Sequence, residues 1–458
     1  MPRLPFPSGA PVMSLFPITV ALVLDHASVT GGAAKVAFDS ALGLKRAGHR
    51  PIVFAAAGPI DPRLTEGGVE VVCLDQHDIL NDPSRLSAAA RGLWNFEAAR
   101  SLEALLASLP RGRSLVHVHG WAKALSPSIA GPIAASGLPA ICTLHEYFLF
   151  CPNGGFYNYN TSKVCRLEPM SLACVTTNCD SRSYPQKLWR CSRHVATCHI
   201  ARLPQAFSDF IVISDLQDGV VRARLPRAAR VHRVANPIEA SQLGPKSLPA
   251  TGDFLYVGRI AREKGPLLFA EAARRAGVVP TYVGDGPIRD ELAGRYPEAR
   301  ILGWKTPDVA RAMTRAARTL VFPSLWYEVQ GLTVSEAKAM GTPVVVSNVC
   351  AGREAIEDGR SGFWFQNGDP DALAAALDRL KDDALVARLS NHAYEAYWAD
   401  APTLERHVGA LLDIYEDMLC RWPEPLPSAA SRADLVDEVI HPLGDHADVE
   451  EPLDAGAP

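Results

Sequence analysis

The chain has 458 residues, of which 48% are hydrophobic and 21% charged, with 46 basic and 50 acidic side chains. This composition is ordinary for a globular enzyme and excludes a disordered chain, a collagen and a small disulfide scaffold. The formal charge of −4 is uneven, because residues 423–458 carry nine acids and one base and leave +4 on the rest, too little to favour nucleic acid as a ligand.

The chain starts with an extension, residues 1–17, followed by an apolar run at residues 18–24. That run is much shorter than the roughly 20 residues of a membrane-spanning helix. It leads into Asp25 and His26 without a small-residue cleavage site. We therefore expect a first buried strand rather than a signal peptide, and a protein of the reducing cytoplasm.

Strand-like and helix-like segments alternate from this point onward. After a helical pattern at 33–47, further apolar runs occur at residues 51–56, 69–74, 115–119 and 140–144. Continuous apolar runs of this kind are typical of parallel strands buried on both faces. A second alternating series begins at residue 254, after a linker that contains Gly, Pro and Ser. We expect an α/β protein of two doubly wound domains whose strand ends face a common cleft.

Two features of the first domain suit a ligand-binding cleft. Gly31 and Gly32 follow the first strand, where the backbone could approach phosphates or a sugar closely. The alternative is that the two glycines only permit a tight turn from strand to helix. The strand at 115–119 carries His117 and His119 on one face, since side chains alternate along a strand. A buried histidine pair is the structural interpretation, and a metal pair is the rarer alternative.

Cysteines cluster where the alternation breaks, between Tyr147 and Phe210. Six of the ten cysteines fall there: Cys151, Cys165, Cys174, Cys179, Cys191 and Cys198. Clustered thiolates in a cytosolic protein favour a tetrahedral structural zinc site, with His145, His194 or His199 as substitute ligands. The best ligand set is Cys151, Cys165, Cys174 and Cys179. No Cys-x-x-Cys pair occurs, so buried free thiols or disulfides stay open as alternatives.

Basic side chains alternate with aromatic and apolar ones in the same segment. They are Arg182, Lys187, Arg190, Arg193 and Arg202, next to Tyr184, Leu188 and Trp189. One interpretation is a solvated helix face. The other is a surface that contacts anionic lipids or a diphospholipid-linked acceptor.

The second domain opens with a basic loop after its first strand. Gly258 starts this loop, and Arg259 and Lys264 could together neutralise a diphosphate. Two surface bases in a polar loop are the plainer alternative.

A second loop of this domain leads into a helix and carries two acids. Gly331 permits close backbone approach, and the free amides of Leu332 and Thr333 favour an anion or sugar hydroxyls. Glu336 could accept hydrogen bonds from ribose hydroxyls. The alternative for Glu328 and Glu336 is that they complement the helix dipole.

The motif strings VGRIAREKG, VGDGP, ILGW and PSLWYEVQGLTVSEAKAMGTPVVVSN occur in this order. In order and spacing they resemble the donor half of family-four retaining glycosyltransferases of the GT-B fold, also called glycosyl transferases group 1, of the bacterial polysaccharide type. The resemblance covers residues 254 to about 400 closely, and several motifs in order are specific where each alone is weak.

The resemblance implies a role for each matched residue. Arg259 and Lys264 fall where the family binds the diphosphate, Glu336 where it binds the ribose, and Glu328 where it contacts the donor sugar. Residues of three glycine-containing loops would offer backbone amides to the donor: Gly31, Gly32, Gly258, Gly331, Leu332 and Thr333. The family places a histidine near the sugar, and His119 is the chosen candidate. Val329 and Gln330 stand where many members have Gly-Phe, which leaves the sugar open.

The composition, the alternating pattern and the resemblance together predict a domain plan. It consists of an acceptor-binding domain at 18–240 with a cysteine-rich insert at 147–205, a nucleotide-sugar-binding domain at 250–400, a C-terminal helix at 401–422 and an acidic disordered tail at 423–458.

The expected reaction is metal-independent, retaining transfer of a sugar from a nucleotide-diphosphate sugar to an acceptor hydroxyl, in polysaccharide or glycolipid synthesis. We expect no cofactor for catalysis and no nucleic acid partner. The zinc ion expected at the cysteines would have a structural role only. The acceptor would be a sugar or a lipid-linked molecule, and the protein would be cytoplasmic, with contact at the inner membrane face. Two alternatives are a GT-B sugar-nucleotide epimerase and a non-enzymatic, metal-held interaction protein.

Overall fold

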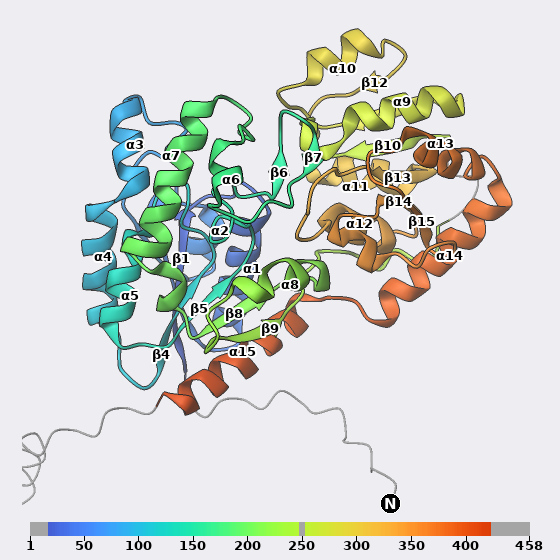
Figure 1. The fold of residues 1–458 in the computed structure, drawn as a ribbon. Helices are drawn as coiled ribbons and strands as arrows, with labels where there is room; N and C mark the ends of the chain where they lie inside the picture. Colours follow the sequence, from blue (N-terminus) through green and yellow to red (C-terminus); the bar gives the residue numbers. More distant parts are fainter. Residues whose placement is uncertain (1–16, 247–251, 423–458) are drawn as a thin grey trace, which may run out of the picture.

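The computed structural model describes residues 17–246 and 252–422 (Figure 1). All but the last residue of the predicted N-terminal extension, and the predicted acidic tail, lie outside the described residues. None of the described helices combines the length and the apolar character that a membrane crossing demands.

The first domain is built on a seven-stranded parallel sheet with the order β3-β2-β1-β4-β5-β8-β9. Its strands are β1 (Thr19–His26), β2 (Arg50–Ala57), β3 (Glu70–Cys73), β4 (Ser114–Val118), β5 (Ala140–Thr143), β8 (Asp209–Val212) and β9 (Arg230–Arg233). Every residue of β1 is buried, as its continuous apolar run predicts. The strand order reverses between β1 and β4, which is where doubly wound sheets bind ligands.

Helices cover both faces of this sheet. They are α1 (Gly32–Arg46), α2 (Pro62–Glu66), α3 (Arg85–Leu93), α4 (Phe96–Ala107), α5 (Ala130–Ser136) and α8 (Asp215–Val221). Helix α1 packs its buried face, including Phe38 and Leu44, into a core shared with β1. Helix α4 buries Ala98, Leu102 and Leu106 against the opposite face.

The segment between β5 and β8 leaves the alternating pattern. It contains the short antiparallel pair β6 (Tyr157–Asn158) and β7 (Lys163–Val164), then α6 (Leu172–Thr176) and the longer α7 (Tyr184–Val195). The β6–β7 pair points toward the second domain (Figure 1). Contact is close at Gly155, where a Cβ atom would lie 2.9 Å from Trp326 Cε3.

The second domain is a six-stranded parallel sheet with the order β12-β11-β10-β13-β14-β15. Its strands are β10 (Phe254–Val257), β11 (Pro280–Val283), β12 (Arg300–Ile301), β13 (Thr319–Phe322), β14 (Val344–Ser347) and β15 (Gly362–Phe365). Its helices are α9 (Pro266–Ala276), α10 (Arg289–Arg295), α11 (Pro307–Ala316), α12 (Leu332–Ala339), α13 (Pro370–Arg379) and α14 (Asp383–Ala399). Again the order reverses, here between β10 and β13.

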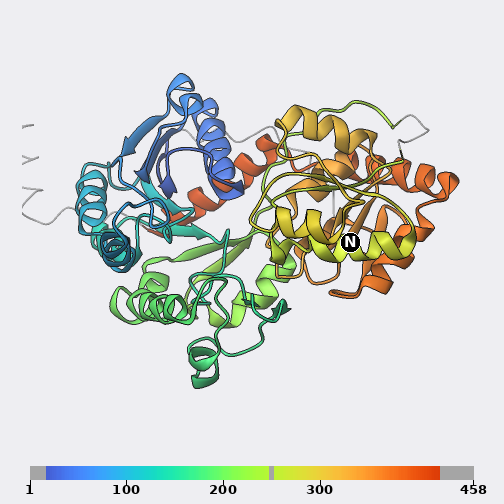
Figure 2. The same cartoon turned by 90° about the horizontal axis from the view of Figure 1, so that it is seen from above.

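The last described helix, α15 (Leu404–Arg421), returns to the first domain. Figure 2 shows it running back beneath the blue N-terminal elements, away from the rest of the second domain. Val408, Leu411, Ile414 and Met418 join the core around β1 and α1. The two doubly wound sheets confirm the predicted α/β class, and α15, the last described helix, packs against the first described strand and helix.

Candidate donor cleft between the two domains

A cavity of about 580 Å³ lies between the two domains. The first domain lines it with the loop after β1, including Gly31 and Gly32, and the second with the loops after β10 and β13. The predicted donor-side residues that line it are Gly31, Gly32, Gly258, Arg259, Lys264, Glu328, Gly331, Leu332 and Thr333. The structure thus brings together residues from three separate segments at the carboxyl ends of the parallel strands.

Lys264 and Glu328 form an ion pair in the cavity wall. The Lys264 Nζ atom lies 2.5 Å from Glu328 Oε1 and 2.6 Å from Oε2. Glu328 also accepts hydrogen bonds from Trp326 Nε1 at 2.9 Å and Ser324 Oγ at 3.0 Å. Burial alone would raise the pKa of Glu328, but the Lys264 ammonium and these hydrogen bonds outweigh it and lower the pKa below its usual value. Glu328 is therefore a carboxylate at neutral pH.

The position of Lys264 depends on a close approach between two loops. Gly265 follows it with a φ of +69° and is the last residue before α9. A Cβ atom at Gly265 would lie 2.1 Å from the carbonyl oxygen of Pro323, at the end of β13. Only glycine fits this backbone and this contact, so the turn locks Lys264 beside the loop that carries Glu328.

Arg259 lies at the mouth of the cavity with a side chain that is 60% exposed. It pairs with Glu263 on the same loop. Its backbone is held by Tyr256, whose hydroxyl donates to the Arg259 carbonyl oxygen at 2.7 Å. The guanidinium can therefore reach a ligand in the cavity by exchanging one anionic partner for another.

Two helix N-termini open toward the cavity from opposite domains. Helix α1 starts at Gly32 and helix α12 at Leu332, and no side chain caps either of them. A Cβ atom at Gly32 would lie 3.3 Å from Leu332 Cδ1, so the two helix starts nearly touch. Free amides at a helix start, added to the helix dipole, favour an anion or hydroxyl oxygens.

The histidines are placed differently from the sequence-based choice. His119 is buried and does not line the cavity among the described residues, whereas His145 does. His119 Nδ1 lies 3.0 Å from His145 Nε2, so His119 stands one layer behind. His117 is a satisfied core residue, with the Tyr415 hydroxyl at 2.6 Å and the Thr143 hydroxyl at 2.7 Å. Sequence reasoning considered His145 only as a substitute metal ligand, although it follows strand β5 as a cleft residue should.

Two acids complete this part of the structure. Glu146, which sequence reasoning missed, lines the cavity, and burial, with a smaller contribution from Asp25, raises its pKa to about 7. Glu336 lies in α12, and burial raises its pKa. Glu336 is not one of the described residues that line the cavity, so its ribose-binding role stays a prediction.

The predicted zinc ligands gather around a buried lysine. Cys151, Cys174 and Cys179 are buried and Cys165 is partly buried, and the described structure contains no disulfide. Lys187 is fully buried, and its Nζ donates to Cys174 Sγ at 3.5 Å. Burial opposes its charge, but the nearby Cys179 and Cys174 sulfurs leave its pKa raised.

These thiols, as placed, do not fit a metal ion. In the described parts of the chain, no three His, Cys, Asp or Glu side chains are arranged to hold one. The ligand set Cys151, Cys165, Cys174 and Cys179 is therefore unsupported by the geometry, because an ammonium group shares the space that a cation would need. The zinc stays a sequence-based prediction.

Two facing doubly wound domains with a basic cleft between their strand ends define the GT-B class of fold. A family model described as Glycosyltransferase Family 4 matches residues 30–242, and one described as Glycosyl transferases group 1 matches residues 251–383. Each match falls within one domain. The chain belongs to the family-four glycosyltransferases, as its donor-side motifs predict.

Known relatives and structures agree with this assignment. An Escherichia coli UDP-Gal:alpha-D-GlcNAc-diphosphoundecaprenol alpha-1,3-galactosyltransferase is 28% identical over 212 residues, which cover 43% of this chain and 54% of that protein. A Mycobacterium tuberculosis glycogen synthase is 32% identical over 187 residues, covering 38% and 41%. The chain thus spans about half the length of the curated relatives it matches.

Solved structures show the same fold. A Rickettsia africae glycosyltransferase superposes with a TM-score of 0.61 and 16% identity, over 88% of this chain and 99% of that one. Anabaena Alr3699/HepE in complex with UDP gives a TM-score of 0.60 and 16% identity, over 87% and 100%. The comparisons favour neither the epimerase nor the non-enzymatic alternative.

Proposed function

We propose that this protein transfers a sugar from a nucleoside diphosphate sugar to an acceptor hydroxyl. One observation carries the proposal: Lys264 and Glu328 meet in an interdomain cavity into which α1 and α12 direct free amides. Such a cavity offers positive charge for a diphosphate and a carboxylate for sugar hydroxyls. The UDP bound by Anabaena HepE and the UDP-Gal in the name of the Escherichia coli relative make a uridine donor our first choice.

Donor binding would rearrange the ion pairs that line the cavity. The diphosphate would draw Lys264 toward itself, and Arg259 away from Glu263. Glu328 would then have acceptor capacity free for sugar hydroxyls, while Trp326 and Ser324 keep its carboxylate in place. The Lys264–Glu328 ion pair therefore holds two proposed ligand contacts close to the donor.

The transfer step develops negative charge on the β-phosphate as the bond to the anomeric carbon breaks. Arg259, Lys264 and the helix amides would stabilise that charge, and we propose that no divalent metal is needed. The acceptor hydroxyl would attack the same face and give its proton to the leaving phosphate, so the anomeric configuration is retained. Carboxylates need not act as an acid and base pair in this scheme.

The acceptor would enter from the first domain, past His145 and Glu146. The name of the Escherichia coli relative specifies a diphosphoundecaprenol-linked sugar, and we propose an acceptor of this lipid-linked class. This would place the protein at the cytoplasmic face of a membrane.

The test is a transfer reaction followed by NMR of the product. The wild-type protein is incubated with nucleotide sugars and lipid-linked acceptors, with and without a chelator. We expect an α-linked product from an α-linked donor, at the same rate when the chelator is present. Inversion of the anomeric centre, or loss of all transfer with the chelator, would contradict the proposed mechanism.

A further inference from the structure

A second cavity, of about 540 Å³, lies in the first domain between α3 and α7. Lys123 lines both this cavity and the donor cleft, so the two spaces adjoin at that residue. We call it the α3–α7 pocket. Its other lining residues include Arg85, Phe148, Arg182, Trp189, Arg190 and Arg193.

Close packing fixes the distance between the two helices. A Cβ atom at Gly92 of α3 would lie 2.7 Å from Cζ2 of Trp189 in α7, so glycine lets the indole approach. The indole Nε1 donates to the Ala89 carbonyl oxygen at 3.3 Å. The wall that Trp189 forms is therefore preformed.

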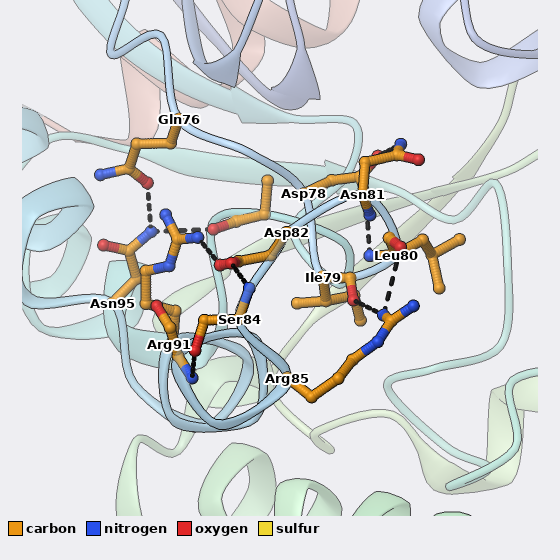
Figure 3. A network of polar contacts seen from close by, with 12 residues as sticks. Gln76, Asp78, Ile79, Leu80, Asn81, Asp82, Ser84, Arg85, Arg91 and Asn95 are labelled. Atoms are coloured by element: carbon orange, nitrogen blue, oxygen red, sulfur yellow. Dashed lines mark hydrogen bonds and ion pairs between the residues drawn. The ribbon is translucent and has the colours of Figure 1, made fainter.

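The loop that forms the opposite wall is held by buried acids (Figure 3). Asp78 accepts hydrogen bonds from the backbone amides of Leu80 and Asn81, at 2.8 and 2.9 Å. The amide of Ile79 donates to the Lys123 carbonyl oxygen at 2.9 Å. Asp78 also contacts His26 Nε2 at 2.9 Å, which ties this loop to the end of β1 beside the donor cleft.

Five basic side chains line the pocket: Arg85, Lys123, Arg182, Arg190 and Arg193. Of these five bases, only Arg190 forms an ion pair with another described residue, namely Asp180 at 2.7 Å. Arg85 donates to main-chain carbonyl oxygens of Leu80 and Ile79 (Figure 3). The pocket thus holds more positive charge than its own acids neutralise.

Arg193 is the deepest of these bases, at 4% exposure. Its guanidinium donates to the Ala122 carbonyl oxygen at 2.8 Å and lies 4.8 Å from the Phe148 ring centre and 5.1 Å from that of Trp189. Burial, together with the neighbouring Arg190 charge, lowers its pKa to about 10. The Glu146 and Asp25 carboxylates oppose this shift, but in the described parts of the chain neither forms an ion pair with Arg193, so the guanidinium can pair with an anionic ligand.

The lining of the pocket is also apolar in part. Leu80, which is 45% exposed, lines it together with Ile79, Phe148 and Trp189. Apolar lining combined with a few polar groups is typical of a pocket that binds a partly apolar ligand. A ligand that fits both features has an anionic group and an apolar chain.

We infer that the α3–α7 pocket binds the phosphate or diphosphate group of a lipid-linked acceptor, with the lipid chain lying on the apolar lining around Leu80. This inference rests on the proposed glycosyl transfer. Lys123 would stand between the bound phosphates and the donor cleft, so the acceptor sugar would extend past it toward Glu146. Arg85 and Arg182 would contact the phosphates.

The test measures binding of farnesyl diphosphate by titration calorimetry. The double variant Arg85→Ala/Arg182→Ala should weaken binding about tenfold or more, since both side chains are exposed and each would lose a charge-assisted hydrogen bond. The matched control Arg100→Ala/Arg388→Ala removes two exposed arginines from α4 and α14 and should bind as the wild type does. UDP affinity should be unchanged in both.

Three further arms separate the alternatives. Farnesol and inorganic diphosphate should each bind much more weakly than farnesyl diphosphate. If inorganic diphosphate binds equally well, the pocket is a site for a free anion and the inference is overturned. Phosphatidylglycerol vesicles that contain no farnesyl diphosphate are the second control. If the double variant loses binding to these vesicles but keeps its affinity for farnesyl diphosphate, the surface docks to membrane lipid and the inference is overturned. If the double variant binds both UDP and farnesyl diphosphate as the wild type does, this inference alone is overturned. If the wild type binds no UDP, the proposed function is overturned.

Discussion

At the scale of single residues, the ion pair between Lys264 and Glu328 is the feature on which donor chemistry depends. It joins a base predicted to bind phosphate with an acid predicted to bind sugar, and both line the same cavity. The sequence could identify both residues because each belongs to a motif at a strand end. Their direct contact could not be predicted, since it depends on how two separate loops approach each other.

Lys264→Ala should lower kcat by about a hundredfold, because it removes a charge worth a few kcal/mol at the transition state. Steady-state rates at saturating donor test this. Lys381→Ala, which removes an exposed lysine of the same domain, should leave the rate unchanged. Near-normal kcat in Lys264→Ala would show that the leaving phosphate is stabilised elsewhere.

Glu146 should make folding stability depend on pH. Its pKa rises from 4.5 when exposed to about 7 in the fold, mainly through burial. Between these values the folded state binds more protons than the unfolded state, so this group's contribution to stability falls as pH rises through that window, by about 1–3 kcal/mol. Urea unfolding at pH 5 and pH 7.5 would measure it.

The glutamine variant supplies the reference for that measurement. Other groups also titrate in this range, so the quantity to compare is the difference between wild type and Glu146→Gln at each pH. We expect Glu146→Gln to gain stability relative to the wild type at pH 7.5 and not at pH 5. An equal difference at both values would mean that Glu146 titrates normally.

At the scale of elements, the turn from Lys264 into α9 is the tightest constraint on the cleft. Gly265→Ala should lower the free energy of unfolding by several kcal/mol, since the added methyl would collide with Pro323 backbone. Gly277→Ala is the matched control, because Gly277 has a φ of +66° and open space around its Cβ position. That variant should cost only about 1 kcal/mol. Equal losses in thermal unfolding would mean that the contact with Pro323 is not rigid.

Prediction from sequence succeeded for elements whose local pattern is sufficient. The buried parallel strands and the helix starts near Gly32 and at Leu332 follow from apolar runs and glycines. The position of His145 in the cavity wall, in front of His119, was missed. It depends on the turn after β5, which carries the chain across the end of the strand that bears His119. Lys187 among the cysteines was missed for a similar reason, since residues distant in sequence meet there.

At the scale of the whole molecule, α15, the last described helix, joins the core of the first domain. The sequence predicted a helix at 401–422 but gave no signal for its partner. In the structure Tyr415 bonds His117 of β4, and His407 Nε2 lies 2.9 Å from the Ser40 hydroxyl of α1. The first domain therefore completes its core with residues that follow the second.

Truncation tests this dependence. A chain ending at residue 403 should lose much of the stability of its first domain, because β1 and α1 would expose the surface that Val408, Leu411, Ile414 and Met418 now cover. A chain ending at residue 422 keeps α15 and should unfold like the full chain. Thermal denaturation of both would decide, and unchanged unfolding of the shorter chain would contradict the role of α15.

The central claim is that the interdomain cleft holds the diphosphate of a nucleotide sugar. Titration calorimetry of UDP tests it most directly, with wild type and Arg259→Ala/Lys264→Ala compared in the presence of a chelator. We predict one bound UDP per wild-type chain without metal, and affinity at least about tenfold lower in the double variant. Equal affinity in both proteins, with the variant fully folded, would contradict the account.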